Sequence, residues 1–250
     1  MSNDELDAGR RRQARHRIFG SSSMSDHKRP AGLFITGTDT EVGKTYVTAL
    51  IARSLVAAGQ RVGVYKPVAS GCVSDGDDLV AEDAVILWQA AGEPGDLHDV
   101  CPQRFAAPLA PHLAARAEGK SVDAELLRSG IEVWRDRCDV ILVEGAGGLM
   151  SPLSDEDYNA DLAYELGYPL VVVAPNVLGV INQTLQTLIT AAVFREGLEI
   201  AGVILNDVAQ REDDVSTDTN LQELIDRCSP PVLGHVRHGQ SSFGDLTALF

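Results

Sequence analysis

The residues best suited to chemistry lie between Gly37 and Thr45 and read Gly-Thr-Asp-Thr-Glu-Val-Gly-Lys-Thr. They follow an apolar run that reads as a strand and open a stretch with helical periodicity, which is the setting of a phosphate-binding loop. Glycines admit backbone N–H groups to phosphate oxygens, Lys44 reaches the β- and γ-phosphates, and Thr45 is a ligand for Mg²⁺. Five residues separate Gly37 from Gly43, one more than usual, so Thr38 takes the place of the first glycine. The segment predicts a nucleotide site.

Two charged residues end predicted strands. Lys66 closes a strand beside Pro67, and Glu144 closes another ahead of Gly-Ala-Gly-Gly. The carboxyl ends of parallel strands meet at one edge of a sheet, so both side chains are expected near the phosphate loop. There a lysine neutralises phosphoryl oxygens and a carboxylate binds Mg²⁺. Position alone equally allows Lys66 to be a solvent-exposed strand end and Glu144 to be solvated.

A third metal ligand is harder to choose, because the stretch after Gly71 is crowded with acids. Such a stretch is also typical of a charged loop followed by an exposed helix face. Ser70, just before it, can hydrogen-bond a substrate, although serine beside glycine is more often a turn residue. The acidic residues are Asp75, Asp77, Asp78, Glu82 and Asp83.

The elements that must position these residues follow from the alternation of short apolar runs with longer helical patterns. Such β/α alternation predicts a doubly wound α/β domain with a mostly parallel sheet, of the P-loop NTPase type, over residues 31–250. The predicted strands are 33–36, 62–66, 140–143, 170–174, 201–206 and 232–236, and the clearest predicted helices are 44–58, 123–137 and 180–195. The stretch 106–117 is predicted to be a loop that leads into a short helix.

Composition narrows the function. The chain has 250 residues and a net charge of −15, so broad attraction to nucleic acid or an anionic membrane is not expected. Its four cysteines form no C-x-x-C pair, which argues against a zinc site or disulfides and favours a reducing cytoplasm. No apolar run approaches the roughly 18 residues that span a bilayer. The sequence predicts a cytoplasmic protein with small-molecule ligands.

Residues 1–30 differ from the rest of the chain. They hold seven basic and four acidic residues and almost no aliphatic periodicity. We predict a disordered N-terminal extension outside the fold, or a misassigned start, with Met24 as the alternative first residue. A basic arm that touches nucleic acid is the less favoured interpretation.

Taken together, three motifs resemble the dethiobiotin synthase family: the phosphate loop, Tyr65-Lys-Pro-Val-Ala-Ser-Gly71 and Val143-Glu-Gly-Ala-Gly-Gly148. Similar segments follow in the same order at 152–155, 178–182 and 206–208, so the resemblance extends from Gly32 to the C-terminus. It implies an ATP- and Mg²⁺-dependent enzyme that carboxylates 7,8-diaminopelargonic acid with CO₂. A carbamate would be phosphorylated by ATP and then closed into a cyclic urea, within a homodimer whose sites are completed across the interface.

The resemblance also implies roles for single residues. Alignment of Glu82-Asp83-Ala84 with a short acidic motif of the family selects Asp83 as the third metal ligand, with Asp78 as the alternative. From the residues alone, the segment 178–182 opens a helix whose N–H groups suit a carboxylate, although an ordinary helix start fits equally well. The implied nucleotide-binding residues are Thr38, Asp39, Thr40, Glu41, Val42, Gly43, Lys44, Thr45, Asn206 and Gly234; the metal ligands are Thr45, Asp83 and Glu144; and the catalytic and substrate-binding residues are Lys44, Lys66, Thr40, Ser70, Gly179, Ile181 and Asn182.

One segment departs from the family. Where the family reads Gly-Glu-Ile-Pro beside the base, this chain reads Gly234-His-Val-Arg237. Asn206 is therefore expected to carry the base contact, because a carboxamide pairs with the N6 and N7 edge of adenine. His235 and His238 have no nearby carboxylate or cysteine partner in the sequence, so we expect a surface role and not a metal site.

Two rival functions share the predicted fold. A switch ATPase of the chromosome-partition type usually has a lysine early in the phosphate loop, where this chain has Thr38 and Asp39, and often a basic membrane anchor, which is missing here. A catalytically silent nucleotide-binding module is disfavoured because Lys44, Lys66 and Glu144 are all present. The sequence therefore favours a ligase.

Overall fold

The computed structural model describes residues 30–76, 78–209 and 214–244. Its centre is a six-stranded sheet in the order β10-β9-β8-β1-β7-β2, with every neighbouring pair parallel. All six strands coincide with predicted ones, and the predicted fold class is confirmed. The strands are β1 Ala31–Gly37, β2 Val62–Tyr65, β7 Val140–Gly148, β8 Leu170–Pro175, β9 Ile200–Asn206 and β10 Val232–Val236.

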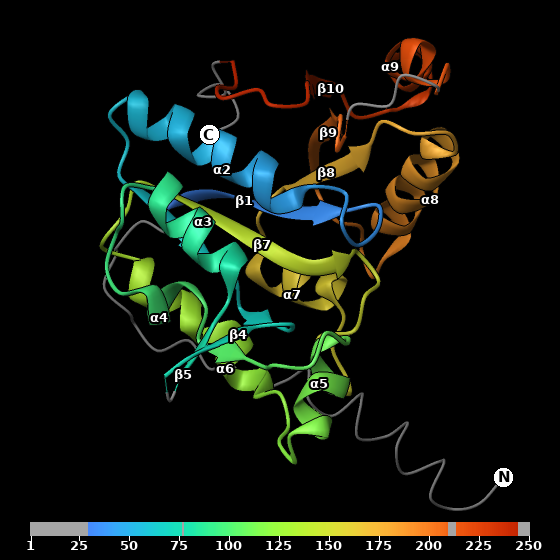
Figure 1. Ribbon diagram of the computed structural model, residues 1–250. Coiled ribbons are helices and arrows are strands. Elements are labelled where there is room, and N and C mark those ends of the chain that lie inside the picture. The colour runs from blue at the N-terminus through green and yellow to red at the C-terminus, as the bar shows by residue number, and fades with distance from the viewer. Residues whose placement is uncertain (1–29, 77, 210–213, 245–250) are drawn as a thin grey trace, which may run out of the picture.

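Helices cover the sheet. In Figure 1, α2 lies above β1 and α7 lies below β7, so the two pack on opposite sides. Two short ribbons, β3 with β6 and β4 with β5, flank the sheet and were not predicted. The helices are α2 Lys44–Ala57, α3 Glu82–Ala90, α4 Leu97–Val100, α5 Pro111–Ala117, α6 Ala124–Ser129, α7 Asn159–Leu166, α8 Val180–Val193 and α9 Thr217–Arg227; the ribbons are β3 Val68–Ala69, β6 Gln103–Arg104, β4 Val73–Asp75 and β5 Asp78–Val80.

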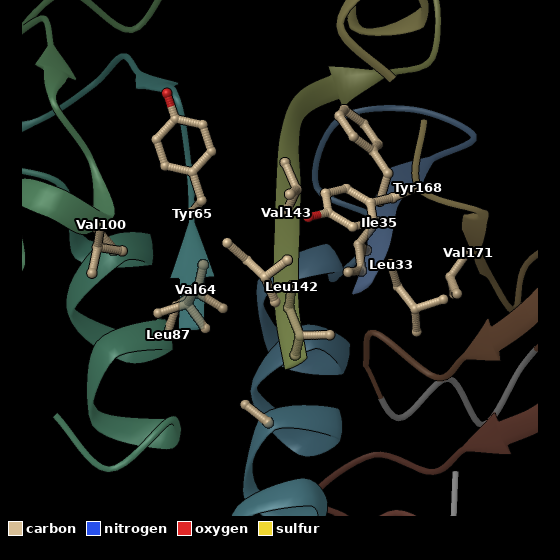
Figure 2. Close-up of a cluster of buried hydrophobic side chains, with 14 of the residues drawn as sticks. Leu33, Ile35, Val64, Tyr65, Leu87, Val100, Leu142, Val143, Tyr168 and Val171 are labelled. Carbon is tan, nitrogen blue, oxygen red and sulfur yellow. The ribbon is translucent and has the colours of Figure 1, made fainter. Parts of the chain in front are cut away.

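The sheet is apolar on both faces, which explains why its strands read as continuous apolar runs. Alternate residues of β8 join different clusters: Val171 and Val173 belong to the large core, whereas Val172 packs with Leu188 of α8. Figure 2 shows part of the large core, where Val64 of β2 lies beside Leu87 of α3, and Leu33 of β1 lies near Val171 of β8. Burial on both faces fixes the strand ends firmly, and the site lies at those ends.

The predicted helix over 123–137 is wrong in part. The chain forms α6 and then a 3-10 helix over Gly130–Trp134. Gly130 lies so close to Tyr65 that a Cβ would stand 2.5 Å from the tyrosine hydroxyl. That hydroxyl donates to the carbonyls of Leu126 and Leu127, at 2.9 and 3.1 Å, and the Leu126 carbonyl also accepts the N–H of Gly130. The α-helix thus gives way to the tighter 3-10 helix at the point where Tyr65 of a distant strand packs against Gly130. The short helix predicted near 106–117 is present as α5.

The remaining predictions concern the N-terminal extension, the cysteines and membrane spans. The extension over 1–30 lies outside the described residues except for Pro30. All four cysteines are free, and three of them are buried. Within the described ranges, no helix has the length and apolar character needed to cross a bilayer.

Candidate active site

The phosphate loop joins β1 to α2, and Gly43 is its tightest point. Gly43 has φ of 86°, a left-handed conformation that favours glycine. A Cβ there would also stand 2.1 Å from Nδ2 of Asn206. The Asn206 amide donates to the carbonyl of Val42 at 3.0 Å. The end of β9 thus holds the loop from the side, and glycine is required for both conformation and space.

The exposed part of the loop is closed by its own polar groups. The N–H of Thr40 donates to Oδ1 of Asp39 at 2.7 Å, and Lys44 Nζ donates to the carbonyl of Asp39 at 3.3 Å. Glu41 adopts a left-handed φ of 57° although it carries a Cβ. Backbone in this conformation turns successive N–H groups toward a common centre, as phosphate binding requires.

Next to the loop, charged side chains from three elements converge. Lys66 Nζ lies 2.7 Å from Oε1 of Glu144 and 2.8 Å from Oδ2 of Asp83. Thr45 Oγ1 donates to the same Glu144 oxygen at 2.8 Å. Lys66 is 4% exposed and Glu144 is fully buried, so neither is the solvated strand end that position alone allowed. We call Lys44, Thr45, Lys66, Asp83 and Glu144 the charged cluster.

Burial and neighbouring charges set the pKa values in the cluster. Burial acts to lower the pKa of Lys66, but Glu144 and Asp83 outweigh it, so the pKa is raised and the ammonium stays charged. Burial lowers the pKa of Lys44, and repulsion from Lys66 adds to this against attraction from Glu144. Burial acts to raise the pKa of Asp83, but the ammonium of Lys66 prevails and lowers it. The shifts of Lys66 and Asp83 thus both favour the charged forms of this pair beside the loop.

The donor set suits Mg²⁺ in the presence of nucleotide. Oε2 of Glu144 is buried and has no hydrogen-bond partner in the described structure, so one carboxylate oxygen is available. Mg²⁺ in nucleotide sites takes one or two carboxylates together with phosphate oxygens and water. Thr45, Asp83 and Glu144 match that pattern. Consistently, the described residues contain no group of three His, Cys, Asp or Glu side chains that would form an all-protein metal cage.

The alternative ligand Asp78 has other neighbours than the charged cluster. It stands at the start of β5, 3.3 Å from Nε2 of His98 and 3.4 Å from Nη2 of Arg104. Asp83, by contrast, lies in the first turn of α3 and reaches Lys66. The structure therefore brings Asp83, and not Asp78, to the charged cluster.

Three of the four residues assigned to substrate lie at the start of α8, and the fourth, Ser70, follows β3. Gly179 precedes α8 with φ of 97°, Ile181 is half-buried, and Asn182 is exposed and accepts from Gln186 at 3.1 Å. Ser70 is half-buried just after β3. Within the described residues, no hydrogen bond joins any of these four predicted positions to the charged cluster.

A cleft of about 490 Å³ connects the loop with α8. Thr38 and Asp39 form one side; the Thr38 N–H is held by the carbonyl of Val173 at 3.0 Å, and its hydroxyl is buried without a partner among the described residues. The other walls were missed from the sequence. For the wall formed by α8, a polar stripe at spacings of three and four residues was the signal in the sequence. They are residues 148–152 with Gln183, Gln186, Thr187 and Thr190.

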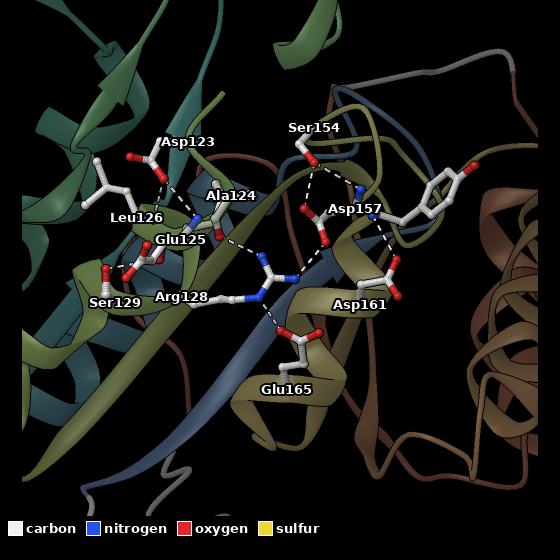
Figure 3. A network of polar contacts seen from close by, with 12 residues as sticks. Asp123, Ala124, Glu125, Leu126, Arg128, Ser129, Ser154, Asp157, Asp161 and Glu165 are labelled. Atoms are coloured by element: carbon white, nitrogen blue, oxygen red, sulfur yellow. Dashed lines mark hydrogen bonds and ion pairs between the residues drawn. The ribbon is translucent and has the colours of Figure 1, made fainter. Parts of the chain in front are cut away.

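A larger cavity, about 970 Å³, lies between α5, α6 and α7 at the amino ends of the strands. Its arginines are already paired. Arg128, for example, lies 2.7 Å from Oδ1 of Asp157 and also contacts Glu165, as Figure 3 shows. Ligands of open α/β sheets bind at the carboxyl ends of the strands. By that rule the smaller cleft, which borders Thr38 and Asp39, is the candidate ligand site.

Among the residues predicted to contact the base, Asn206 bonds the phosphate loop directly. It is 2% exposed, and its Oδ1 has no hydrogen-bond partner within the described structure. Gly234 lies in β10, where a Cβ would stand 2.8 Å from Cζ of Phe243. The C-terminal segment thus packs directly against the predicted base-binding strand.

The expected surface role of His235 is wrong. Its side chain is 8% exposed, and its Nε2 lies 2.7 Å from Oδ1 of Asp207. Asn176 donates to the same carboxylate oxygen at 2.8 Å. Because β10 pairs with β9, His235 is turned into this polar group and away from solvent. His238 is exposed, as expected.

Comparison with known proteins identifies the family. A family model described as an AAA domain matches residues 31–242. The ATP-dependent dethiobiotin synthetase BioD of Rhodopirellula baltica is 46% identical over 215 residues, which cover 82% of this chain and 83% of the relative. The protein of the same name from Anaeromyxobacter dehalogenans is 44% identical over 193 residues, 77% of this chain and 83% of the relative.

Among solved structures, the cell-division ATPase MinD of Pyrococcus furiosus overlaps 83% of each chain with a TM-score of 0.43 and 19% identity, which is too low to bear on function. The sequence relatives are much nearer, and they span most of both chains. The family expected from the motifs is confirmed. The chain belongs to the family of ATP-dependent dethiobiotin synthetases.

Proposed function

We propose that this chain carboxylates 7,8-diaminopelargonic acid with CO₂ and closes the ring with ATP to give dethiobiotin. One amine attacks CO₂ and loses a proton, which gives a carbamate. A carbamate oxygen then attacks the γ-phosphorus of ATP and releases ADP. The second amine attacks the carbonyl carbon, expels phosphate and loses a proton. The observation that carries the proposal is the charged cluster beside the phosphate loop in a chain of this family.

The roles follow from charge and position. Lys66 and Lys44 are cations at the place where negative charge develops on phosphoryl and carbamate oxygens, and fixed charges of this kind lower the barrier. The raised pKa of Lys66 keeps it protonated in neutral solution. Thr40 and Ser70 are proposed to hydrogen-bond the substrate or carbamate. No covalent bond to the enzyme is needed, so positioning and electrostatics supply the catalysis.

Thr45, Asp83 and Glu144 are the residues proposed to hold Mg²⁺. When bound, the ion would supply positive charge to the phosphates of ATP. The buried acceptor Oε2 of Glu144 supports this assignment, because an unpaired buried carboxylate oxygen is costly without a cation or donor. Asn206 and Gly234 are proposed to contact the base, for which Oδ1 of Asn206 offers a free acceptor.

The diamine is proposed to enter the cleft beside α8, with its carboxylate at the helix start formed by Gly179, Ile181 and Asn182. Unpaired N–H groups at a helix N-terminus favour an anion. We further propose a homodimer that completes each site. The apolar surface of α8 supports this, because Leu178, Ile189 and Val193 are 83%, 63% and 71% exposed on or beside a single helix.

The deciding experiment measures phosphate release with ATP and Mg²⁺, with and without diamine and bicarbonate. We expect turnover only when both are present, and dethiobiotin as the product by mass spectrometry. Turnover that ignores the diamine but rises with DNA or vesicles would instead support the switch ATPase. Nucleic acid and membrane are not proposed as partners, in keeping with the acidic net charge. The proposed compartment is the cytoplasm.

A further inference from the structure

The glycine-rich end of β7 loses its regular pairing with β1 immediately after Glu144. Ile35 of β1 pairs with Glu144, and the next paired residues are Gly37 and Gly148. Between these points β1 advances by two residues and β7 by four, so β7 carries a bulge of two extra residues. Peptide groups in a bulge lose their partners on the neighbouring strand. Other groups must satisfy them, because a buried unpaired peptide group is costly.

One side chain satisfies both peptide groups of Ala146, in the middle of this bulge. Asn159, the first residue of α7, is fully buried. Its Nδ2 donates to the carbonyls of Ala146 and Gly148 at 2.7 and 2.8 Å, and its Oδ1 accepts from the N–H of Ala146 at 3.1 Å. Both amide hydrogens and the amide oxygen are thus used on the bulge. A third contact to the carbonyl of Ser151 is longer, at 3.4 Å.

The same carboxamide explains the residue that follows Glu144. A Cβ on Gly145 would stand 2.5 Å from Oδ1 of Asn159, closer than real Cβ contacts come. Glycine at 145 and asparagine at 159 therefore fit each other. The backbone of α7 also bonds the segment that follows the bulge, because the N–H of Asn159 donates to the carbonyl of Ser151 at 3.1 Å.

The start of α7 is itself held in place. Figure 3 shows Asp161 receiving the N–H of Tyr158, at 3.0 Å, and Asp157 joined to Arg128 and Ser154. These contacts surround Asn159 on both sides in the sequence. The start of α7 is thus held in place by its own hydrogen bonds, and it holds the Asn159 carboxamide against the bulge, as positioning of a site requires.

The bulge in turn borders the cleft. A Cβ on Gly147 would stand 3.4 Å from Oγ1 of Thr40, and one on Gly148 would stand 3.4 Å from the carbonyl of Gly37. Gly148 and Ser151 line the cleft directly. Movement of this segment would therefore change the wall of the cleft.

We propose that Asn159 is a positioning residue, whose carboxamide fixes the bulge after Glu144 and so shapes the cleft for the diamine. The inference rests on the proposed function for the identity of the substrate. The contact between Asn159 and the bulge does not depend on that function. The nucleotide site should be less affected, because Asn206 holds the phosphate loop from the opposite side.

The kinetic test compares wild type with Asn159→Ala and Asn159→Asp, the second of which keeps the shape but loses both donors. We expect the KM for diamine to rise by about tenfold or more, while the Kd for ATP without Mg²⁺ changes by less than about threefold. The matched control is Gln103→Ala, because the Gln103 carboxamide also hydrogen-bonds a backbone N–H and a backbone carbonyl. Both belong to Asp123, at 2.7 and 3.0 Å. It should lower the Tm but leave the KM for diamine unchanged.

A second measurement needs no substrate. Gly145→Ala should lower the Tm in wild type, but by at most about half as much in the Asn159→Ala background, where the methyl group has room. A diamine KM within about twofold of wild type in both Asn159 variants, or Tm shifts that simply add, would overturn the inference. If wild type itself shows no diamine-dependent turnover, the proposed function fails, and the Tm coupling alone then decides whether Asn159 fixes the bulge.

Discussion

At the scale of single residues, Lys66 serves two opposed demands. It must stay charged to act on phosphoryl oxygens, and it must be buried to act strongly. Its pairing with Glu144 and Asp83 resolves the conflict, because the two carboxylates more than offset the effect of burial on its pKa. The same pairing means that catalysis and stability are linked at this residue.

We predict that Lys66→Ala lowers kcat by on the order of 10²-fold or more, as loss of a transition-state charge does. It should also lower the free energy of unfolding by about 3 to 5 kcal/mol, because Glu144 is left as an uncompensated buried charge. The double variant Lys66→Ala/Glu144→Gln should recover much of the Tm but none of the kcat. A kcat of Lys66→Ala within about tenfold of wild type would show that Lys66 is only a structural counter-ion.

A second residue-scale prediction concerns base choice. Asn206→Ala removes the free acceptor Oδ1 and the bond to Val42. We expect the preference of kcat/KM for ATP over GTP to fall by roughly 1 to 3 kcal/mol, the worth of a good bidentate amide–adenine pair. Arg237→Ala is the control, since its side chain is 69% exposed. A larger loss of selectivity in the control would transfer base recognition to the C-terminal segment.

At the scale of elements, five of the six strands (β1, β2, β7, β8 and β9) were predictable because they are largely buried and read as mostly apolar runs. The sixth, β10, is half-buried and contains His235. What the sequence did not reveal depends on contacts between distant segments. The helix α6 gives way to a 3-10 helix where Tyr65 packs against Gly130, and the burial of His235 is set by the pairing of β10 with β9. The role of Asn159 likewise requires a bulge in β7 that no local pattern announces.

The same reasoning applies to the site. The phosphate loop, Lys66 and Glu144 are marked locally, since each stands where a strand ends. The polar stripe of α8 is visible in the sequence as a spacing, but only the fold shows that it faces Thr38 and Asp39 across a cleft. Asp83 was selected over Asp78 by resemblance alone, and the structure supplies the physical reason, its contact with Lys66.

An element-scale prediction concerns the polar network that joins α6 to the start of α7. Burial acts to raise the pKa of Asp157, but hydrogen bonds from Arg128 and Ser154 outweigh it, so the pKa is lowered. A group with a lowered folded pKa stabilises the fold above its unfolded pKa, about 3.9 for aspartate, and loses that effect as pH falls through the folded pKa. Asp157→Asn should therefore be destabilising at pH 7, by about 1.5 to 3 kcal/mol, and progressively less so below about pH 4.

Chemical denaturation of wild type and Asp157→Asn across that pH range measures the effect. Asp155→Asn is the matched control, because Asp155 forms an ion pair with Arg116 in which both side chains are more than half exposed. Exposed pairs of this kind contribute little. If the two substitutions cost the same at pH 7, the network does not support α7.

At the scale of the whole molecule, the chain is strongly acidic and yet is proposed to bind the anions ATP and carbamate. A net charge of −15 repels them at long range, so binding depends on local cations and helix N-termini. Lys44, Lys66 and the start of α2 provide these at one point. The remainder of the acidic surface then disfavours nucleic acid without affecting the site.

The final prediction tests the dimer as a unit of function. The 26.7 kDa chain is expected to sediment at twice that mass, because α8 leaves Ile189 and Val193 largely exposed in a single subunit. Ile189→Glu places a charge on that surface and should produce monomers. If the partner completes the diamine site, the KM for diamine should rise by about tenfold or more, whereas ATP binding, built from one subunit, should persist. Val56→Glu on α2, where Val56 is 38% exposed, should change neither mass nor KM. A monomeric Ile189→Glu variant with a normal KM for diamine would show that each subunit holds a complete site.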